Sequence, residues 1–216
     1  MSAELVETLP LAQRLALAYA PPSARGDTLA LLALDARLAG IVRTDGEPVI
    51  AQMKLAWWRE RLAQDPQDWP LGEPLLALLR KGRLATDTLA PLVDGWEGLL
   101  ADHLDEGIVH GFVAGRVALW QGLAAAHSGN AGQAGQVAHE HALADLALNL
   151  GSEAEAALVR DLAQAQPWNR PRLPRPLRPL AILHGLSHRA LRRGAGELLD
   201  GPGAMATALR LGILGR

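Results

Sequence analysis

Apolar residues recur along this chain with helical spacing, and no run of residues alternates with the period of a half-buried strand. Between residues 27 and 42, one face of a 3.6-residue period carries Leu31, Leu34, Leu38 and Ile41. Asp45-Gly46 then predicts a turn, and Pro48 stands where a second helix can begin, at its first position. The pattern therefore predicts a helical pair over about 27–42 and 48–63.

The same spacing, bounded by proline, glycine and capping residues, predicts further helices. The longer ones cover about 87–104, 105–126, 136–150, 153–165 and 179–193, with short segments over 10–19, 74–81 and 202–211. Gly111, Gly115 and Gly122 would let a neighbour approach the helix over 105–126 closely, so we expect that helix at the centre. We predict an all-α fold of about eight helices, as one domain over residues 1–216.

Composition agrees with a helical protein that can bury a sizeable core. The 216 residues are 49% hydrophobic and only 4% aromatic, and leucine and alanine far outnumber β-branched residues. The formal net charge of −2 disfavours a general nucleic-acid surface, so we expect no nucleic-acid partner. The absence of cysteine excludes disulfides, cysteine-ligated zinc and thiol nucleophiles.

No segment has the pattern of a secretory signal peptide or of a membrane-spanning helix. Glu4 and Glu7 occupy the place of a basic leader, and the longest charge-free run, Val117 to Ala138, is interrupted by polar residues and glycine. We expect a cytoplasmic protein, and peripheral contact with a membrane stays open.

The helical pair carries a recognisable set of motifs. They are Leu31-Leu32-Ala33-Leu34-Asp35, Leu38-Ala39, Glu47-Pro48 and Leu55-Ala56-Trp57-Trp58-Arg59-Glu60-Arg61-Leu62. This order resembles the opening of the squalene/phytoene synthase family. The resemblance implies the isoprenoid synthase fold, a helical bundle around a cavity in which active members join two prenyl diphosphates with Mg²⁺.

The metal-binding residues of that family do not appear at the matching positions. Active members carry an Asp-x-x-x-Asp pair, which shares a helix face and binds metal-bound diphosphate. Aligned on the motifs above, the two positions fall at Ala39 and Arg43, and the arginine before them becomes Ala36. The resemblance places Ala36, Ala39, Gly40 and Arg43 on the cavity wall, with no metal ligand among them. Asp35 and Arg37 are expected to point elsewhere.

A second aspartate-rich signature of the family should fall near residues 140–151. Asp145 is the only aspartate there, and it is out of register with the expected pair. The loss of two independent metal sites fits a degenerate branch of the family. The chain resembles, in particular, the complex I assembly factor with a phytoene synthase-like domain.

Other polar clusters offer weaker candidate sites. Asp102 and Glu106 are spaced by four and are the best remaining acidic pair for Mg²⁺, although charge at a helix N-terminus explains Glu106 more simply. His184 and His188 have zinc-compatible spacing but lack a third ligand, so a hydrogen-bonded or solvated pair is favoured. His141 and Asp145 are expected to form a local pair.

Two surface segments are candidates for binding. Trp57, Trp58 and Arg59 could line a cavity or contact a partner, with burial in the core as the simpler interpretation of the tryptophans. A basic segment could meet anionic lipid headgroups or an acidic partner; its members are Arg170, Arg172, Arg175 and Arg178, with Arg189, Arg192 and Arg193 beyond it. A solvated loop is the simpler interpretation of these arginines.

Three hypotheses follow. In the first, the chain has lost catalysis and acts as a binding or assembly protein, with a respiratory-complex protein as its partner or an isoprenoid or other lipid as its ligand. In the second, it is an active Mg²⁺-dependent prenyltransferase with atypical metal ligands. In the third, it is a helical interaction module whose resemblance is incidental. The first needs no cofactor, and the second needs Mg²⁺.

Overall fold

The computed structural model describes residues 2–43, 47–127, 129–169 and 172–215. Within these ranges it contains eleven α-helices and no strand, which confirms the all-α prediction and agrees with an isoprenoid synthase fold. The helices are α1 (Ser2–Glu7), α2 (Leu11–Ala18), α3 (Pro22–Arg43), α4 (Pro48–Ala63), α5 (Pro74–Lys81), α6 (Ala90–Gly98), α7 (Glu106–Ala126), α8 (Ala131–Asn149), α9 (Glu153–Gln164), α10 (Arg178–Arg193) and α11 (Pro202–Leu214).

The expected count of about eight helices was too low: the predicted ranges already number ten, and α1 is the helix that they lack. Helix α1 has only six residues, too few for a periodic pattern, and it packs its buried Leu5 into the core. Helix α3 begins at Pro22 and not near residue 27 as predicted, because a first-turn proline lacks only an N–H that would have no helical partner. Helix α8 also starts earlier than predicted, where the Asn130 side chain accepts a hydrogen bond from the Gln133 N–H at 2.9 Å.

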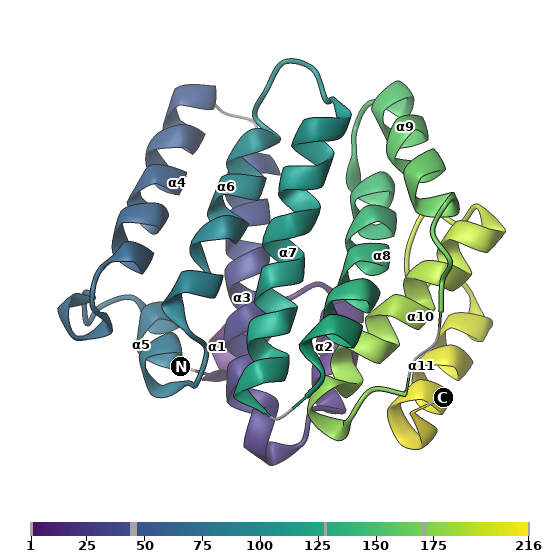
Figure 1. The fold of residues 1–216 in the computed structure, drawn as a ribbon, viewed down its shortest axis with the longest axis horizontal. Coiled ribbons are helices and arrows are strands. Elements are labelled where there is room, and N and C mark those ends of the chain that lie inside the picture. Colours follow the sequence, from purple (N-terminus) through teal and green to yellow (C-terminus); the bar gives the residue numbers. More distant parts are fainter. Residues whose placement is uncertain (1, 44–46, 128, 170–171, 216) are drawn as a thin grey trace.

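Helix α7 lies at the centre, between α6 and α8, as its glycines predicted (Figure 1). A Cβ atom on Gly115 would lie 2.8 Å from the Leu92 Cα atom of α6, and one on Gly95 would lie 2.8 Å from the Phe112 Cα atom of α7. The two helices therefore meet backbone to backbone through one glycine each. Gly111 plays no part in this close approach of α6 and α7, because nothing lies within 4 Å of the position that its Cβ atom would take.

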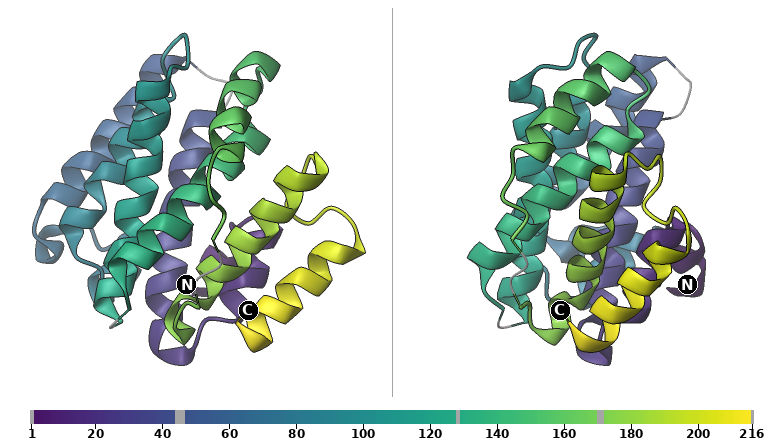
Figure 2. Two further views of the ribbon diagram at one scale, coloured as in Figure 1. Left: turned by 45° about the vertical axis from the view of Figure 1, so that its right-hand side comes forward. Right: turned by 90° about the vertical axis from the view of Figure 1, so that its right-hand side faces the viewer.

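The remaining helices surround this centre in an order that brings distant parts of the sequence together. In Figure 1, α4, α6, α7 and α8 lie side by side, α3 passes behind α6 and α7, and α10 and α11 follow beyond α8. The two views of Figure 2 show α11 as an outer helix that packs along α10. Helices α3, α7, α8 and α10 thus meet around one region of the interior, where the cavity described below is found.

None of the described helices combines the length and the apolar character that crossing a bilayer requires. The predicted turn at Asp45-Gly46 lies outside the described residues.

Candidate functional site

A cavity of about 370 Å³ lies where α3, α7, α8 and α10 meet. Helix α3 contributes Asp35 and the four residues that the resemblance placed on the cavity wall: Ala36, Ala39, Gly40 and Arg43. The other helices contribute Arg116, His141, Asp145, Leu148, Asn149 and Leu183. Two connecting segments close the cavity, one over residues 8–13 before and within α2, and one over residues 196–199 between α10 and α11.

The buried side chain of Arg116 on α7 organises the polar wall of this cavity. Its Nη2 atom donates to Oδ2 of Asp35 at 2.8 Å and its Nε atom donates to Oδ1 at 3.2 Å, a bidentate arrangement. Its Nη1 atom donates to Oδ2 of Asp145 at 2.6 Å. The Trp96 indole N–H of α6 donates to Oδ1 of Asp35 at 2.8 Å. One arginine thereby joins α3 and α8, and Asp35 adds α6 to the same network.

The charges in this network stabilise one another. Burial alone would raise the pKa of Asp145, but the Arg116 charge outweighs that effect and holds the pKa below its ordinary value. Burial alone would lower the pKa of Arg116, and the two carboxylates instead hold it above its ordinary value. Asp145 and Arg116 therefore carry opposite charges at neutral pH.

His141 stands beside this network without joining it. Burial is the main cause that lowers the pKa of His141 to about 4, and the Arg116 charge acts in the same direction. The Nδ1 atom of His141 lies 2.8 Å from the Ser187 Oγ atom on α10. The predicted local pair of His141 and Asp145 is present only as a charge interaction, because their hydrogen bonds go to Ser187 and Arg116 on other helices.

Residues 13–105 match the family model for squalene/phytoene synthase. This match supports kinship with that family. It covers the cavity residues of α3 and the Trp-Trp-Arg-Glu motif of α4, and it ends just before α7 begins. Neither the curated proteins nor the solved structures gave a match to the chain.

The cavity of this squalene/phytoene synthase-like chain does not fit a Mg²⁺ site. Magnesium needs several oxygen ligands in near-octahedral geometry. Alignment on the helical motifs puts the Ala39 methyl group and the Arg43 guanidinium where active members would have aspartates, and both residues line the cavity. The carboxylates of Asp35 and Asp145 are turned toward Arg116, which donates to both oxygens of Asp35 and to Oδ2 of Asp145. Among the residues with a described position, no three histidines, aspartates or glutamates group as metal ligands do.

The expectation that Asp35 points away from the cavity was wrong. Asp35 lines the cavity and is 7% exposed, whereas Arg37 lies on another face of α3, 3.4 Å from Glu73. Two signals in the sequence could have revealed the network. Asp35 is the only charged residue between Thr28 and Ala36, and Arg116 is the only formally charged residue between Gly107 and Ala138. Isolated charges inside apolar helices need partners, because burying an unpaired charge is costly.

The remaining predicted site residues lie outside this cavity. Asp102 and Glu106 are both exposed beside the start of α7, where Asp105 caps the helix by accepting from the Ile108 N–H at 2.8 Å. Trp58 is buried, as the simpler interpretation held, but Trp57 is 38% exposed. Arg59 forms ion pairs with Asp94 and Glu97 of α6.

The basic segment before α10 is spread over the surface. Arg170 lies outside the described residues, and Arg172 and Arg175 are exposed. Arg178 is partly buried and donates to the Leu211 carbonyl oxygen at 3.2 Å, which ties the start of α10 to α11. Burial, with repulsion from Arg175, lowers the pKa of Arg178 from its ordinary value.

Proposed function

We propose that this squalene/phytoene synthase-like protein does not join prenyl diphosphates, and that it works by binding, as a lipid-holding or assembly protein. One observation carries the proposal: the Arg116 guanidinium pairs with two carboxylates, Asp35 and Asp145, in the cavity that by resemblance corresponds to the diphosphate site of active family members. A cavity organised in this way has no free carboxylate pair with which to neutralise a leaving diphosphate through Mg²⁺.

The Arg116 network is costly to rearrange, which supports a permanent rather than a switchable role. Arg116 and Asp35 are both less than a tenth exposed. Freeing Asp35 or Asp145 for a metal would therefore leave the buried Arg116 cation without one of its two partners. Breaking a buried pair in this way costs about 3–5 kcal/mol. The binding of a metal ion would have to offset this cost as well as the free energy needed to remove water from the ion.

The remainder of the cavity suits an apolar ligand. Its apolar lining comes from both closing segments and from three helices, and consists of Leu11, Ala36, Ala39, Leu148, Leu183, Leu198 and Leu199. Arg43 is exposed at the α3 end of the cavity, where it can meet a polar or anionic head group. This combination supports an isoprenoid or other lipid ligand whose chain lies along α3.

Catalysis can be tested directly. The purified protein is incubated with Mg²⁺ and farnesyl or geranylgeranyl diphosphate, beside an active squalene/phytoene synthase, and released diphosphate is measured. We expect release from the active enzyme alone. Diphosphate release by this protein that disappears in Asp35→Asn or Asp145→Asn, or in the double variant Asp102→Ala/Glu106→Ala, would establish the prenyltransferase alternative.

Ligand binding can be tested by native mass spectrometry of the protein isolated from cells. We expect a co-purifying lipid that is lost in Ala39→Leu, since the larger side chain would fill the cavity beside α3. Ala154→Leu adds the same volume on the exposed face of α9 and serves as the matched control. Lipid retained equally by both variants would show that it binds elsewhere.

A partner surface is also present on α4. Val49, Ile50, Met53 and Trp57 are between 38% and 68% exposed and follow one stripe of the helix. By resemblance to the complex I assembly factor, we propose a respiratory-complex protein as the partner. Affinity capture from the source organism should recover such a protein with the wild-type chain and lose it with Met53→Ser/Trp57→Ser.

The control for the capture experiment lies on the opposite side of the molecule. Met205→Ser/Leu209→Ser removes two exposed apolar side chains from α11, where Met205 is 47% and Leu209 is 44% exposed. We expect this variant to retain the partner. If no respiratory-chain protein is recovered reproducibly with the wild-type chain, the assembly role is refuted, and lipid binding is then tested on its own.

A further inference from the structure

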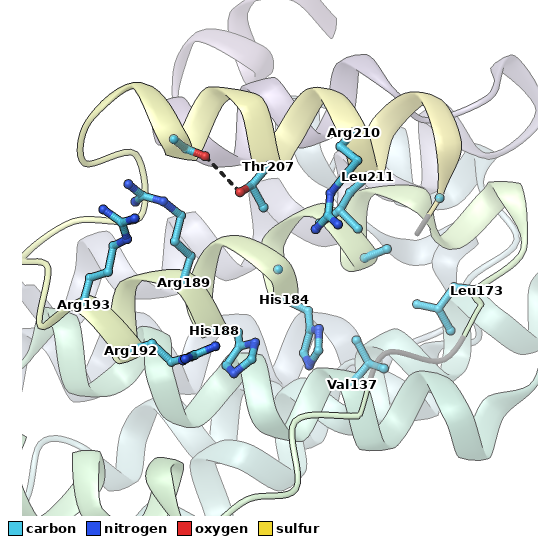
Figure 3. Close-up of a pocket in the computed structure, with 14 residues that line it drawn as sticks. Val137, Leu173, His184, His188, Arg189, Arg192, Arg193, Thr207, Arg210 and Leu211 are labelled. Atoms are coloured by element: carbon cyan, nitrogen blue, oxygen red, sulfur yellow. Dashed lines mark hydrogen bonds between the residues drawn. The ribbon is translucent and has the colours of Figure 1, made fainter.

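A second pocket, of about 440 Å³, lies between α10 and α11 and shares no lining residue with the cavity at α3. Its rim is strongly basic: Arg189, Arg192 and Arg193 come from the end of α10, and Arg210 reaches across from α11 (Figure 3). His184 and His188 line the same side of α10. No acidic residue is among the lining residues in the described part of the chain.

The arginines are not explained by pairing within the protein. No ion pair or hydrogen bond joins any of the four to another described residue. The Nη1 atom of Arg189 is buried and has no hydrogen-bond partner within the described ranges. A buried donor left in this state costs about 1–3 kcal/mol. Four neighbouring cations also repel one another, so the site is electrostatically incomplete without an anion.

The rest of the pocket adds to its preference for an anion. Helix α11, of 13 residues, begins beside Arg189, and its N-cap, Gly201, provides no side-chain acceptor. The Arg189 guanidinium lies close to this helix start, since a Cβ atom on Gly203 would be 3.1 Å from the Arg189 Nη2 atom. Helix N-termini carry partial positive charge and favour anions. The Arg189 guanidinium and the start of α11 thus act on the same space.

The two histidines are held in fixed positions at the floor of the pocket. The His184 Nε2 atom lies 2.6 Å from Oε2 of the buried Glu140. The Trp168 ring stacks on His188, with centroids 4.9 Å apart and an interplanar angle of 11°, and it also contacts His184. Below the rim, the lining is apolar and includes Val137, Leu173, Ala181 and Leu211.

We infer that this pocket binds the phosphate group of a ligand that also has an apolar portion. Guanidinium groups bind phosphate oxygens in bidentate geometry, and several of them match the multiple charges of a phosphomonoester or diphosphate. The apolar floor receives the uncharged part of the ligand. A soluble phosphorylated molecule and a phospholipid headgroup both present this chemistry. The inference is independent of the loss of catalysis proposed above.

The test uses the full chain and two kinds of probe. Inorganic diphosphate is titrated calorimetrically in phosphate-free buffer, and flotation is measured with phosphatidylcholine vesicles that contain or lack phosphatidic acid. We expect saturable binding to at least one phosphate-bearing probe. Arg192 and Arg210 are exposed, so Arg192→Gln/Arg210→Gln should stay folded. Losing one charge-assisted hydrogen bond weakens binding about tenfold, so the double variant should lose about 100-fold.

A matched control separates this pocket from general charge attraction. Arg14→Gln/Arg160→Gln removes two charges from α2 and α9, at residues that do not line the pocket, and should bind like the wild type. Binding of diphosphate points to a soluble ligand, and binding only to vesicles with phosphatidic acid points to a lipid headgroup; both support the pocket. Absence of binding to either probe, or an equal loss in the two double variants, would overturn it.

Discussion

The guanidinium of Arg116 and the carboxylate of Asp35 face each other in bidentate geometry inside the protein, although 81 residues separate them in the chain. The pair joins the central helix α7 to α3, the helix that carries Ala39 and Arg43. Because the pair lies at the cavity wall, the same two residues bear on the stability of the protein and on the proposed loss of metal binding. Measurements on this pair therefore test the structure and the proposed function together.

Removing Asp35 should be strongly destabilising. Asp35→Ala leaves Arg116 buried with only Asp145 as an ionic partner and deprives the Trp96 N–H of its acceptor. We expect a loss of about 3–5 kcal/mol in the free energy of unfolding, measured by urea denaturation at neutral pH. Asp161→Ala, at an exposed position of α9, should change it by no more than about 0.5 kcal/mol. Similar values for the two variants would contradict the buried network.

Adding one methyl group should have opposite effects at two glycines of α7. Gly115→Ala would place a Cβ atom 2.8 Å from the Leu92 Cα atom, and backbone cannot move aside easily, so we expect a loss of about 1–3 kcal/mol. Gly111→Ala meets nothing within 4 Å and should gain up to about 1 kcal/mol from helix propensity. Thermal unfolding of both variants distinguishes the signs, and a stabilising Gly115→Ala would disprove the close approach of α6.

The stability of the protein should fall as the pH decreases below about 6.5. Burial lowers the pKa of His141 to about 4, so between pH 6.5 and 4 the unfolded chain binds a proton that the folded chain does not. Between pH 7.5 and 5 this difference amounts to a loss of about 2 kcal/mol. Asp145, whose pKa is lowered in the folded state, adds to the loss at still lower pH.

His141→Gln should weaken this pH dependence while keeping a polar group near Ser187. The measurement is the urea midpoint at pH 7.5 and pH 5 for the two proteins. The wild type should lose about 2 kcal/mol more than the variant over this range. An equal loss in both proteins would mean that His141 is protonated as easily in the folded state as in the unfolded state.

The ion pairs between α4 and α6 should matter much less. Arg59 pairs with Asp94 at 2.7 Å and with Glu97, whose hydrogen bond is the main cause that raises the pKa of Arg59. The Arg59 side chain is 37% exposed, so solvent screens both pairs. We expect Arg59→Ala to cost about 1 kcal/mol in low salt and less in high salt. A cost that does not change with salt would point to packing rather than charge.

Local sequence signals predicted the helices where proline, glycine and capping residues mark their ends. The bounds of α4 and α5 agree with prediction because each begins with proline at its first position. The Ser152 cap of α9 was likewise evident, and its side chain accepts from the Glu155 N–H. Helix α1 could not be predicted in this way, since six residues form a stable helix only when packing stabilises them.

The partners of polar residues were harder to predict. Spacing alone predicts that His141 and Asp145 pair on one helix. In the structure, the hydrogen bond of His141 is to Ser187 and that of Asp145 is to Arg116. Spacing reports only neighbours on the same helix, and a buried charge takes whichever partner the packing of other helices brings near. For the same reason, the arginines that gather around one pocket, Arg189, Arg192, Arg193 and Arg210, come from two helices.

The sequence by itself determined the helical class and the central place of α7, because both depend on residue identity and local period. It also has Ala39 and Arg43 where the resemblance leads one to expect aspartates. Only the tertiary structure decided that Arg116 bridges Asp35 and Asp145, and that α10 and α11 enclose a basic pocket. Both depend on how helices distant in sequence cross and pack, and local propensity contains no information about those crossings.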